Sequence, residues 1–554
     1  MKPNELFHAS SVMAVGTIIS RITGFIRNIL AAAVLGTALL ADTYNLANVI
    51  PNILYNLLIG GALTAIFVPQ LIRSFSDADG GRAFASKLVT TISTVLLALV
   101  VLGVIFAPLL VRIYAPEYAT KGFEDEYRLA VEFTRYCLPQ IFFLGLFTML
   151  GQVANARGSF APLMWAPILN NLIVIGVFVT LLIEAPRLST HTITSTQIQF
   201  LGWGTTFGVV IQALVLIPVV KRTGISLRPK FGLGGLGKSF SLAGWTLVYV
   251  LVSQLGYWIT VRISTSAAVQ SAKEGVRTGV GFTPFGNAYL IMMLPYSIVT
   301  ISIITALLPH LSKLAIEKKS EEVRDQLIRA IKMVGVLTIP AGVGFMLFGP
   351  LITRVLYVGI GKADAIYVGQ VLAAFGLGLV AFSINIILIR GFNAFEDTKT
   401  QVPSILLINV IAVALSYLSF MLLPSRWVTV GLGFAFSISY IVGLFYTLRL
   451  LVRHTGRIHI RDFIEQHTRL FIASLLAMVP LFAVSQYFSW VNANSSAFQR
   501  LGELSIIMVA GFTGYFFIAR RIGVSEISVT SELMKNQFAS FRSSRRKPSS
   551  SGGE

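Results

Sequence analysis

The sequence predicts an all-α polytopic membrane protein. Of its 554 residues, 55% are hydrophobic and only 12% are charged, and the mean hydropathy is +0.76. Soluble domains carry about 25% charged residues. Many apolar runs reach the roughly 20 residues that a helix needs to cross the hydrocarbon of a bilayer. Regular alternation of apolar and polar residues between turn signals, which is typical of a membrane β-barrel, does not occur.

Fourteen apolar runs have spanning length, and we expect each to form one transmembrane helix. Most of the 44 lysines and arginines fall in cytoplasmic segments if the N-terminus is cytoplasmic. This asymmetry predicts an even number of helices, with both termini in the cytoplasm. The net charge of +20 has the same origin, so we expect no nucleic-acid partner. The predicted spans are 9–35, 41–72, 86–113, 128–156, 160–184, 199–220, 239–268, 281–311, 330–357, 365–391, 401–423, 427–450, 468–490 and 500–521.

Two sequence echoes indicate an internal repeat. Thr64–Leu71 resembles Thr305–Leu311 about 240 residues later, and Asn155–Asn171 resembles Asn393–Asn409 at nearly the same offset. The offset contains six predicted helices, so the two halves run parallel, which is a transporter architecture with the substrate site between halves. The alternative is that helix ends bearing proline converged.

The repeat predicts two parallel six-helix lobes followed by two extra C-terminal helices and a tail. The tail is rich in serine and basic residues, a composition typical of disorder and of attraction to anionic lipid. The predicted divisions are an N-lobe at 1–222, a C-lobe at 223–453, the extra helices at 454–521, and the tail at 522–554.

The first helix carries Arg21 and Arg27, six residues apart and on either side of Gly24. A charge at membrane depth costs at least about 2.5 kcal/mol, so it indicates function unless it reaches an interface. We expect a kink at Gly24 to turn both guanidinium groups toward a common cavity that holds an anion. The alternative is a pair that extends to the membrane surface or binds an acid.

The second helix carries a polar stripe. Asn45, Asn48, Asn52 and Asn56 follow Asp42 at steps of three or four along one side of the helix. We expect these residues, together with Asn28, to bind substrate. The alternatives are asparagines that bond neighbouring helices, and an Asp42 that pairs with arginine, binds a coupling cation or caps a helix.

Helix seven carries a sparser polar set, of which Gln254 and Arg262 are the candidate binding residues. Arg262 lies near a predicted helix end, so it is also a candidate interfacial anchor. Proline and glycine kink helices, and we therefore expect hinges at Gly24, Pro51 and Pro295.

No constellation of catalytic residues is present, so we expect no enzyme. The six histidines are scattered, and no Gly-rich loop precedes a lysine-serine pair of the kind that binds ATP. The single cysteine, Cys137, excludes an internal disulfide. We expect no metal and no cofactor, and the sequence leaves open a coupling cation.

Several motifs resemble the MurJ (MviN) family of lipid II flippases, within the superfamily of multidrug, oligosaccharidyl-lipid and polysaccharide exporters. The resemblance implies fourteen helices in two lobes, with two extra C-terminal helices that form a groove for a lipid tail. It also implies that Arg21, Arg27 and Asp42 occupy important family positions. The motifs are Ser20–Arg27, Ala41-Asp42, Pro51-Asn52, Phe67–Pro69, Leu308–Lys313, Gly391-Phe392 and Asp397–Thr400.

The chain departs from the common pattern of that family. Tyr55 stands where members often carry a basic residue, and the region of Leu290 and Met293 lacks an arginine and an acid. These variants resemble those of actinobacterial members. Our hypothesis is that Arg262 replaces the missing charge of helix eight.

The resemblance implies a flippase of the bacterial cytoplasmic membrane, which moves an undecaprenyl-pyrophosphate-linked muropeptide from the inner to the outer leaflet by alternating access. Membrane lipids are its other expected partners. One alternative is a cation-coupled exporter of drugs or of another polyprenyl-linked glycan. A drug site should carry deep acids, whereas the deep charge here is cationic. Another alternative is a non-transporting membrane scaffold that binds cell-wall or division proteins.

Overall fold

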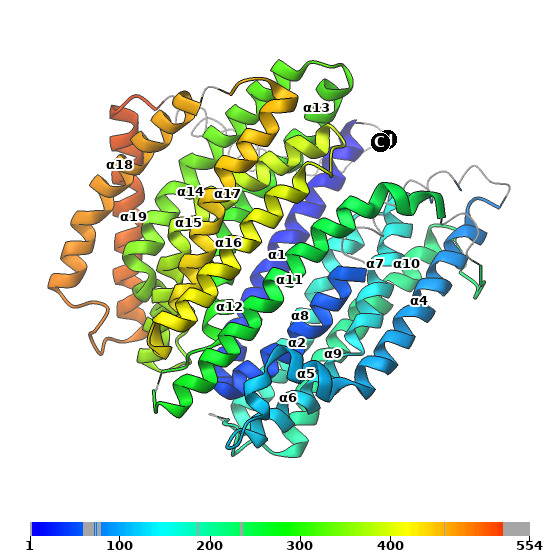
Figure 1. Cartoon of the computed structure of the whole chain (residues 1–554), viewed down its shortest axis with the longest axis horizontal. Coiled ribbons are helices and arrows are strands. Elements are labelled where there is room, and N and C mark those ends of the chain that lie inside the picture. Colours follow the sequence, from blue (N-terminus) through cyan, green and yellow to red (C-terminus); the bar gives the residue numbers. More distant parts are fainter. Residues whose placement is uncertain are drawn as a thin grey trace, which may run out of the picture. The chain divides into compact units, whose positions relative to one another are not determined.

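The structure is a computed structural model, and it describes residues 3–58, 71, 74, 79–185, 188–225, 227–232, 237–276, 278–458 and 460–524. The Phe67–Pro69 motif and the basic tail beyond 524 lie outside the described residues. Every regular element in the described ranges is helical (Figure 1), which confirms the predicted fold class.

Thirteen helical segments in the described ranges are long and apolar enough to cross a membrane. They correspond to thirteen of the fourteen predicted spans, and the remaining span contains α2. The chain is therefore a multi-pass membrane protein, and the count of fourteen stays a prediction because part of the second span is not described. The helices are α1 (Pro3–Leu35), α2 (Leu39–Leu58), α4 (Arg82–Ile105), α5 (Ala107–Tyr114), α6 (Glu124–Cys137), α7 (Gln140–Ala156), α8 (Ala161–Glu184), α9 (Ser195–Leu214), α10 (Leu216–Arg222), α11 (Gly237–Lys273), α12 (Phe282–Pro295), α13 (Ile301–Ile316), α14 (Ser320–Leu356), α15 (Lys362–Ala394), α16 (Gln401–Leu422), α17 (Ser425–Thr455), α18 (Ile460–Tyr487) and α19 (Ala497–Arg521), with a short 3₁₀ helix η1 (Pro116–Ala119) and a π-helical turn η2 (Tyr296–Thr300).

Several predicted spans are interrupted at or near proline. The third divides at Phe106, two residues before Pro108, and the fourth divides around Pro139. The eighth changes at Pro295 into the π-helical turn η2 before α13 continues. Proline has no N–H to donate, and its ring clashes with the carbonyl group four residues earlier in a helix. These breaks therefore follow from the positions of the prolines.

The chain forms two compact units. Unit 1 contains Met1–Leu290, Leu356–Val371 and Thr398–Ser439, whereas unit 2 contains Ile291–Val355, Leu372–Asp397 and Tyr440–Glu554. Each is described by itself below. The lobe boundaries predicted from the repeat remain a prediction.

In unit 1, α1 packs along α8, and glycines on α1 permit close approach. A Cβ atom on Gly24 would lie 3.3 Å from Nδ2 of Asn171. That nitrogen donates to the carbonyl oxygen of Ser20 at 3.0 Å and to Oγ1 of Thr23 at 3.1 Å. The buried asparagine therefore fixes α8 against α1 around Gly24.

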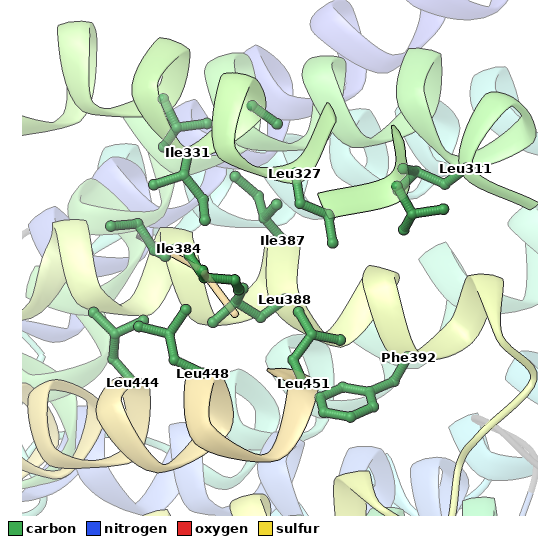
Figure 2. Close-up of a cluster of buried hydrophobic side chains, with 14 of the residues drawn as sticks. Leu311, Leu327, Ile331, Ile384, Ile387, Leu388, Phe392, Leu444, Leu448 and Leu451 are labelled. Carbon is green, nitrogen blue, oxygen red and sulfur yellow. The ribbon is translucent and has the colours of Figure 1, made fainter. Parts of the chain in front are cut away.

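In unit 2, buried aliphatic side chains of α14, α15 and α17 form a core (Figure 2). Beyond this core, α18 and α19 run side by side (Figure 1). The hydroxyl of Tyr515 on α19 donates to the carbonyl oxygen of Val336 on α14 at 2.6 Å. The two last helices are therefore docked on α14. The labelled core residues are Leu311, Leu327, Ile331, Ile384, Ile387, Leu388, Phe392, Leu444, Leu448 and Leu451.

Candidate functional site

An open cavity of about 270 Å³ lies in unit 1, lined by residues of α1, α2, α7, α8 and α9. Its volume suits part of a polar headgroup. Most of its lining is polar, and the one charged side chain among the lining residues is Arg27. The lining residues are Arg27, Asn28, Ala31, Tyr44, Asn45, Asn48, Asn52, Gln140, Leu144, Asn170, Phe178, Thr205 and Val209.

The asparagine stripe of α2 faces this cavity. Asn48 donates through Nδ2 to the carbonyl oxygen of Tyr44 at 2.9 Å, and Asn52 donates to that of Asn48 at 2.7 Å. Gln140 on α7 donates to Oδ1 of Asn48 at 3.3 Å. Because each amide nitrogen bonds a carbonyl one turn back in its own helix, the side chains of Asn48 and Asn52 are held in fixed orientations.

Arg27 supplies the positive charge. It is half-buried, and among the described residues no hydrogen bond or ion pair engages its guanidinium group. A guanidinium group has five N–H donors in a planar fork that fits phosphate or carboxylate. The donors of Arg27 are thus free to bind an anion in the cavity.

Arg21 does not share this position. It is exposed and is not among the cavity-lining residues. The helix α1 runs without interruption through Gly24, so six residues of regular helix turn the two arginines to different faces, about 120° off a common direction. The expectation that both line one cavity is wrong for this conformation, and a hinge at Gly24 remains a prediction.

Asp42 is fully buried and binds backbone rather than a side-chain cation. Its Oδ2 accepts from the amide of Phe282 at 3.0 Å, and its Oδ1 accepts from that of Thr283 at 2.7 Å. These are the first amides of α12, which have no acceptor within their own helix. Asp42 therefore caps α12 instead of its own helix, and its charge complements the dipole of α12.

The other predicted site residues lie apart from this cavity. Asn56 and Arg262 are half-buried and do not line it. Gln254 lines a separate apolar crevice of unit 1, together with Trp258 and residues of α2 and α5. Pro51 is buried within α2.

Tyr55, which replaces the basic residue common in the resembled family, bonds Oγ1 of Thr148 on α7 through its hydroxyl at 2.5 Å. A hydrogen bond between helices thus takes the place of a charge at this position.

Four further polar lining residues were not predicted as site residues. Tyr44 bonds Oγ1 of Thr205 at 2.8 Å through its hydroxyl, and Asn170 donates to Oε1 of Gln212 at 2.9 Å. Gln140, which bonds Asn48 as described above, is the fourth of these residues after Tyr44, Thr205 and Asn170. A signal existed for Asn170, which belongs to the repeated Pro167–Asn171 segment, and for Gln140, a polar residue after a proline in an apolar run.

A second pocket, of about 150 Å³, lies in unit 2 and is apolar. Residues of α14, α18 and α19 form most of its lining, and Pro295 completes it. No charged side chain is among its lining residues, which are Pro295, Pro340, Ala341, Gly344, Phe345, Phe348, Ile352, Met478, Leu504, Ile507, Met508 and Phe512.

A sequence profile described as "Lipid II flippase MurJ" matches residues 31–506 of this chain. The chain belongs to the MurJ family of lipid II flippases. A probable lipid II flippase MurJ of Rhizobium tropici is 27% identical over 534 residues, which cover 94% of this chain and 95% of that protein. A lipid II flippase MurJ of Burkholderia cenocepacia is 28% identical over 435 residues, covering 77% and 81%.

Solved structures agree on the fold. The "Lipid II flippase MurJ, inward closed conformation" has a TM-score of 0.70 at 20% identity and covers 92% of this chain and 99% of that chain. An inward-facing multidrug resistance transporter of the MATE family has a TM-score of 0.61 at 16% identity, covering 80% and 98%. The MurJ family therefore rests on the sequence matches, whereas the scaffold is shared with drug exporters.

Proposed function

We propose that this MurJ-family protein moves lipid II, an undecaprenyl-pyrophosphate-linked muropeptide, from the inner to the outer leaflet of the cytoplasmic membrane for cell-wall synthesis. The observation that supports this most directly is the polar cavity of unit 1, in which Arg27 is the one charged residue of the lining and has no partner among the described residues. An anionic lipid headgroup is the substrate class that this charge favours, whereas a cationic drug is not.

Within the cavity, Arg27 would bind the pyrophosphate through its guanidinium fork. The amides of Asn28, Asn45, Asn48 and Asn52 would bond the hydroxyl and amide groups of the sugar and peptide. Each amide has an acceptor oxygen and a second N–H beyond the one bonded within the protein, which suits the uncharged polar groups of the sugar and peptide.

The apolar pocket of unit 2 would hold part of the polyprenyl chain. Its lining is entirely uncharged, which matches a hydrocarbon chain, and close packing in the pocket would hold that chain by van der Waals contacts. The extra helices α18 and α19 form part of this pocket, which supports the lipid-tail groove implied by the family resemblance.

We further propose that both termini are cytoplasmic and that the two predicted lobes alternate in access to the leaflets. A membrane potential negative inside contributes about 2.3 kcal/mol per charge per 100 mV to the outward movement of an anion. Such a potential could drive the step without ATP.

The test is the leaflet distribution of lipid II in cells depleted of this protein and complemented with wild type, Arg27→Ala or Arg21→Ala. We expect wild type and Arg21→Ala to restore lipid II to the outer leaflet and Arg27→Ala to leave it inside, at matched expression. Restoration by all three would discard the proposed site. Unchanged lipid II in depleted cells that carry no second flippase would discard the function itself.

A further inference from the structure

A short segment of unit 1, Gly279–Thr283, is fastened by side chains from three different helices. Asp42 of α2 accepts from the amides of Phe282 and Thr283, as described above. The amide of Gly281 donates to Oγ1 of Thr429 on α17 at 3.2 Å. The amide of Gly279 donates to Oδ1 of Asp364 on α15 at 2.8 Å. Four of the five backbone amides in this segment thus donate to side chains. Two of the three acceptor side chains are carboxylates, and the third is the hydroxyl of Thr429.

The fit of this segment is close. A Cβ atom on Gly279 would lie 2.4 Å from both the carbonyl oxygen and Oγ1 of Thr37, in the turn between α1 and α2. A Cβ atom on Gly281 would lie 2.0 Å from Oδ2 of Asp42, and Gly281 has φ +140°. Only glycine allows the backbone to lie this close to its neighbours at both positions.

The same segment is joined directly to the substrate cavity. Asn45, a cavity-lining residue, donates through Nδ2 to Oγ1 of Thr283 at 2.9 Å. Thr283 and Phe282 are buried. The fastened segment therefore lies against the α2 side of the cavity, next to a residue that the substrate would contact.

We propose that Gly279–Thr283 is a closure of the headgroup cavity and that Asp364 is a positioning residue for transport, which holds this closure shut. Asp364 acts on the substrate path through the segment and does not contact the cavity itself. Asp42 holds the C-terminal end of the segment and Asp364 holds the N-terminal end. Passage of a headgroup past this point requires both carboxylates to release backbone amides. This inference extends the proposed function, on which its link to transport rests.

The chain offers a built-in reporter for the test. Cys137 is the single cysteine of the sequence and is fully buried, with its Sγ atom 3.7 Å from Oδ1 of the cavity-lining Asn48. Opening of the closure should admit water to this thiol. A negatively charged methanethiosulfonate reagent would be applied to the purified full-length protein in lipid nanodiscs, where both faces are accessible, and the rate of modification measured.

We expect Asp364→Ala to accelerate modification of Cys137 about tenfold and to lower lipid II transport. Asp364→Asn keeps an acceptor oxygen but loses the charge, which makes such bonds roughly twice as strong, so an intermediate acceleration of about threefold is expected. A residue that only stabilises the fold would lower the thermal unfolding temperature and leave the modification rate of the folded protein unchanged.

A second variant tests the closure without touching a charge. Gly279→Ala places a methyl group against Thr37 and should accelerate modification about tenfold. The matched control is Gly286→Ala on α12, where a Cβ atom would meet nothing within 4 Å. Asp125→Asn, at an exposed acid paired with Arg128, is the control for charge.

Wild-type modification rates in folded Asp364→Ala and Gly279→Ala would overturn the inference, whatever their transport activity. The modification assay needs no lipid II, so it stands apart from the proposed function. Accelerated modification in a protein that moves no lipid II would refute the proposed function and retain the closure.

Discussion

The polar cavity of unit 1 and the apolar pocket of unit 2 differ in the chemistry of the side chains that line them. The cavity presents amides, hydroxyls and one unpaired guanidinium group, whereas the pocket presents only carbon and thioether surface. Hydrogen bonds within and between helices hold the cavity side chains, whereas apolar contacts between helices shape the pocket. Under the proposed function, the difference teaches that the polar headgroup and the polyprenyl chain of the substrate have separate binding surfaces.

The largest expected effect concerns the support of the apolar pocket. Arg354, at the end of α14, is only 3% exposed and donates to the carbonyl oxygens of Trp490, Val491 and Ala493 in the α18–α19 connection. Arg354→Ala removes the side-chain donor of these three half-buried carbonyl groups, so we expect it to weaken docking of the connection by about 3 kcal/mol. Hydrogen exchange should rise in residues 485–500 and stay unchanged in α2.

Arg426→Ala is the matched control, because Arg426 is exposed and contacts the ring of Trp427. Faster exchange in α2 as well as in 485–500 of Arg354→Ala would show that the cavity and the pocket are not separable.

The next effect tests the cavity charge. We expect Arg27→Ala to reduce transport about 100-fold, which corresponds to about 2.7 kcal/mol, a reasonable value for a charge-assisted contact with phosphate. Arg27→Lys keeps the charge and loses the planar fork, so its loss should be smaller. The assay is lipid II transport at matched protein levels. Equal losses in Arg27→Ala and Arg21→Ala would remove the distinction between the cavity and the exposed surface of α1.

A filled pocket should have an intermediate effect. Gly344→Leu on α14 adds a side chain where a Cβ atom would meet nothing within 4 Å, so it occupies the pocket without a clash. We expect transport to fall about tenfold, because the leucine takes the space of the polyprenyl chain, which then loses its packing contacts in the pocket. Affinity for a soluble headgroup analogue should not change.

Gly176→Leu on α8, which also points into open space, is the control for an added leucine. Reduced affinity for the headgroup analogue in Gly344→Leu would contradict the separation of the two surfaces.

The smallest effect distinguishes a cavity hydroxyl from a purely structural one. Tyr44→Phe removes the bond to Thr205, and Tyr55→Phe removes the bond to Thr148. Each should cost about 1 kcal/mol of stability, measured by thermal unfolding. Only Tyr44 lines the cavity, so we expect a transport loss of about threefold for Tyr44→Phe and none for Tyr55→Phe. The reverse order would place the substrate elsewhere.

The contrast between the regions also explains what could be predicted from the sequence. Polar residues within apolar runs are conspicuous, so Arg27 and three of the four asparagines of α2 could be assigned to one polar cavity from the sequence, whereas Asn56 does not line it. The apolar pocket could not be predicted, because Phe348 or Ile507 reads the same whether it lines a pocket, a core or the lipid surface. Only the family resemblance implied a lipid-tail groove at the two C-terminal helices.

Arg21 shows a second limit. Its charge at membrane depth indicated function, but its direction depends on whether Gly24 kinks the helix, and α1 is continuous there. Asn171 of α8 packs against Gly24 and holds α1 in this form. A tertiary contact of this kind cannot be predicted from a single sequence. Asp364 carried no signal at all, since an acid in the first turn of a helix is common.

Asp42 binds two amide groups of the main chain, and this choice of partner has a genetic consequence. When a carboxylate pairs with a side chain, the loss of one can be repaired by a change in the other, and the two positions vary together over evolution. Every residue except proline supplies a peptide N–H, so a change of side chain at position 282 or 283 neither removes nor repairs the contact with Asp42. Suppressors of Asp42→Asn should therefore not be charge swaps at 282 or 283, and should arise instead at positions that change how the backbone at the start of α12 approaches α2.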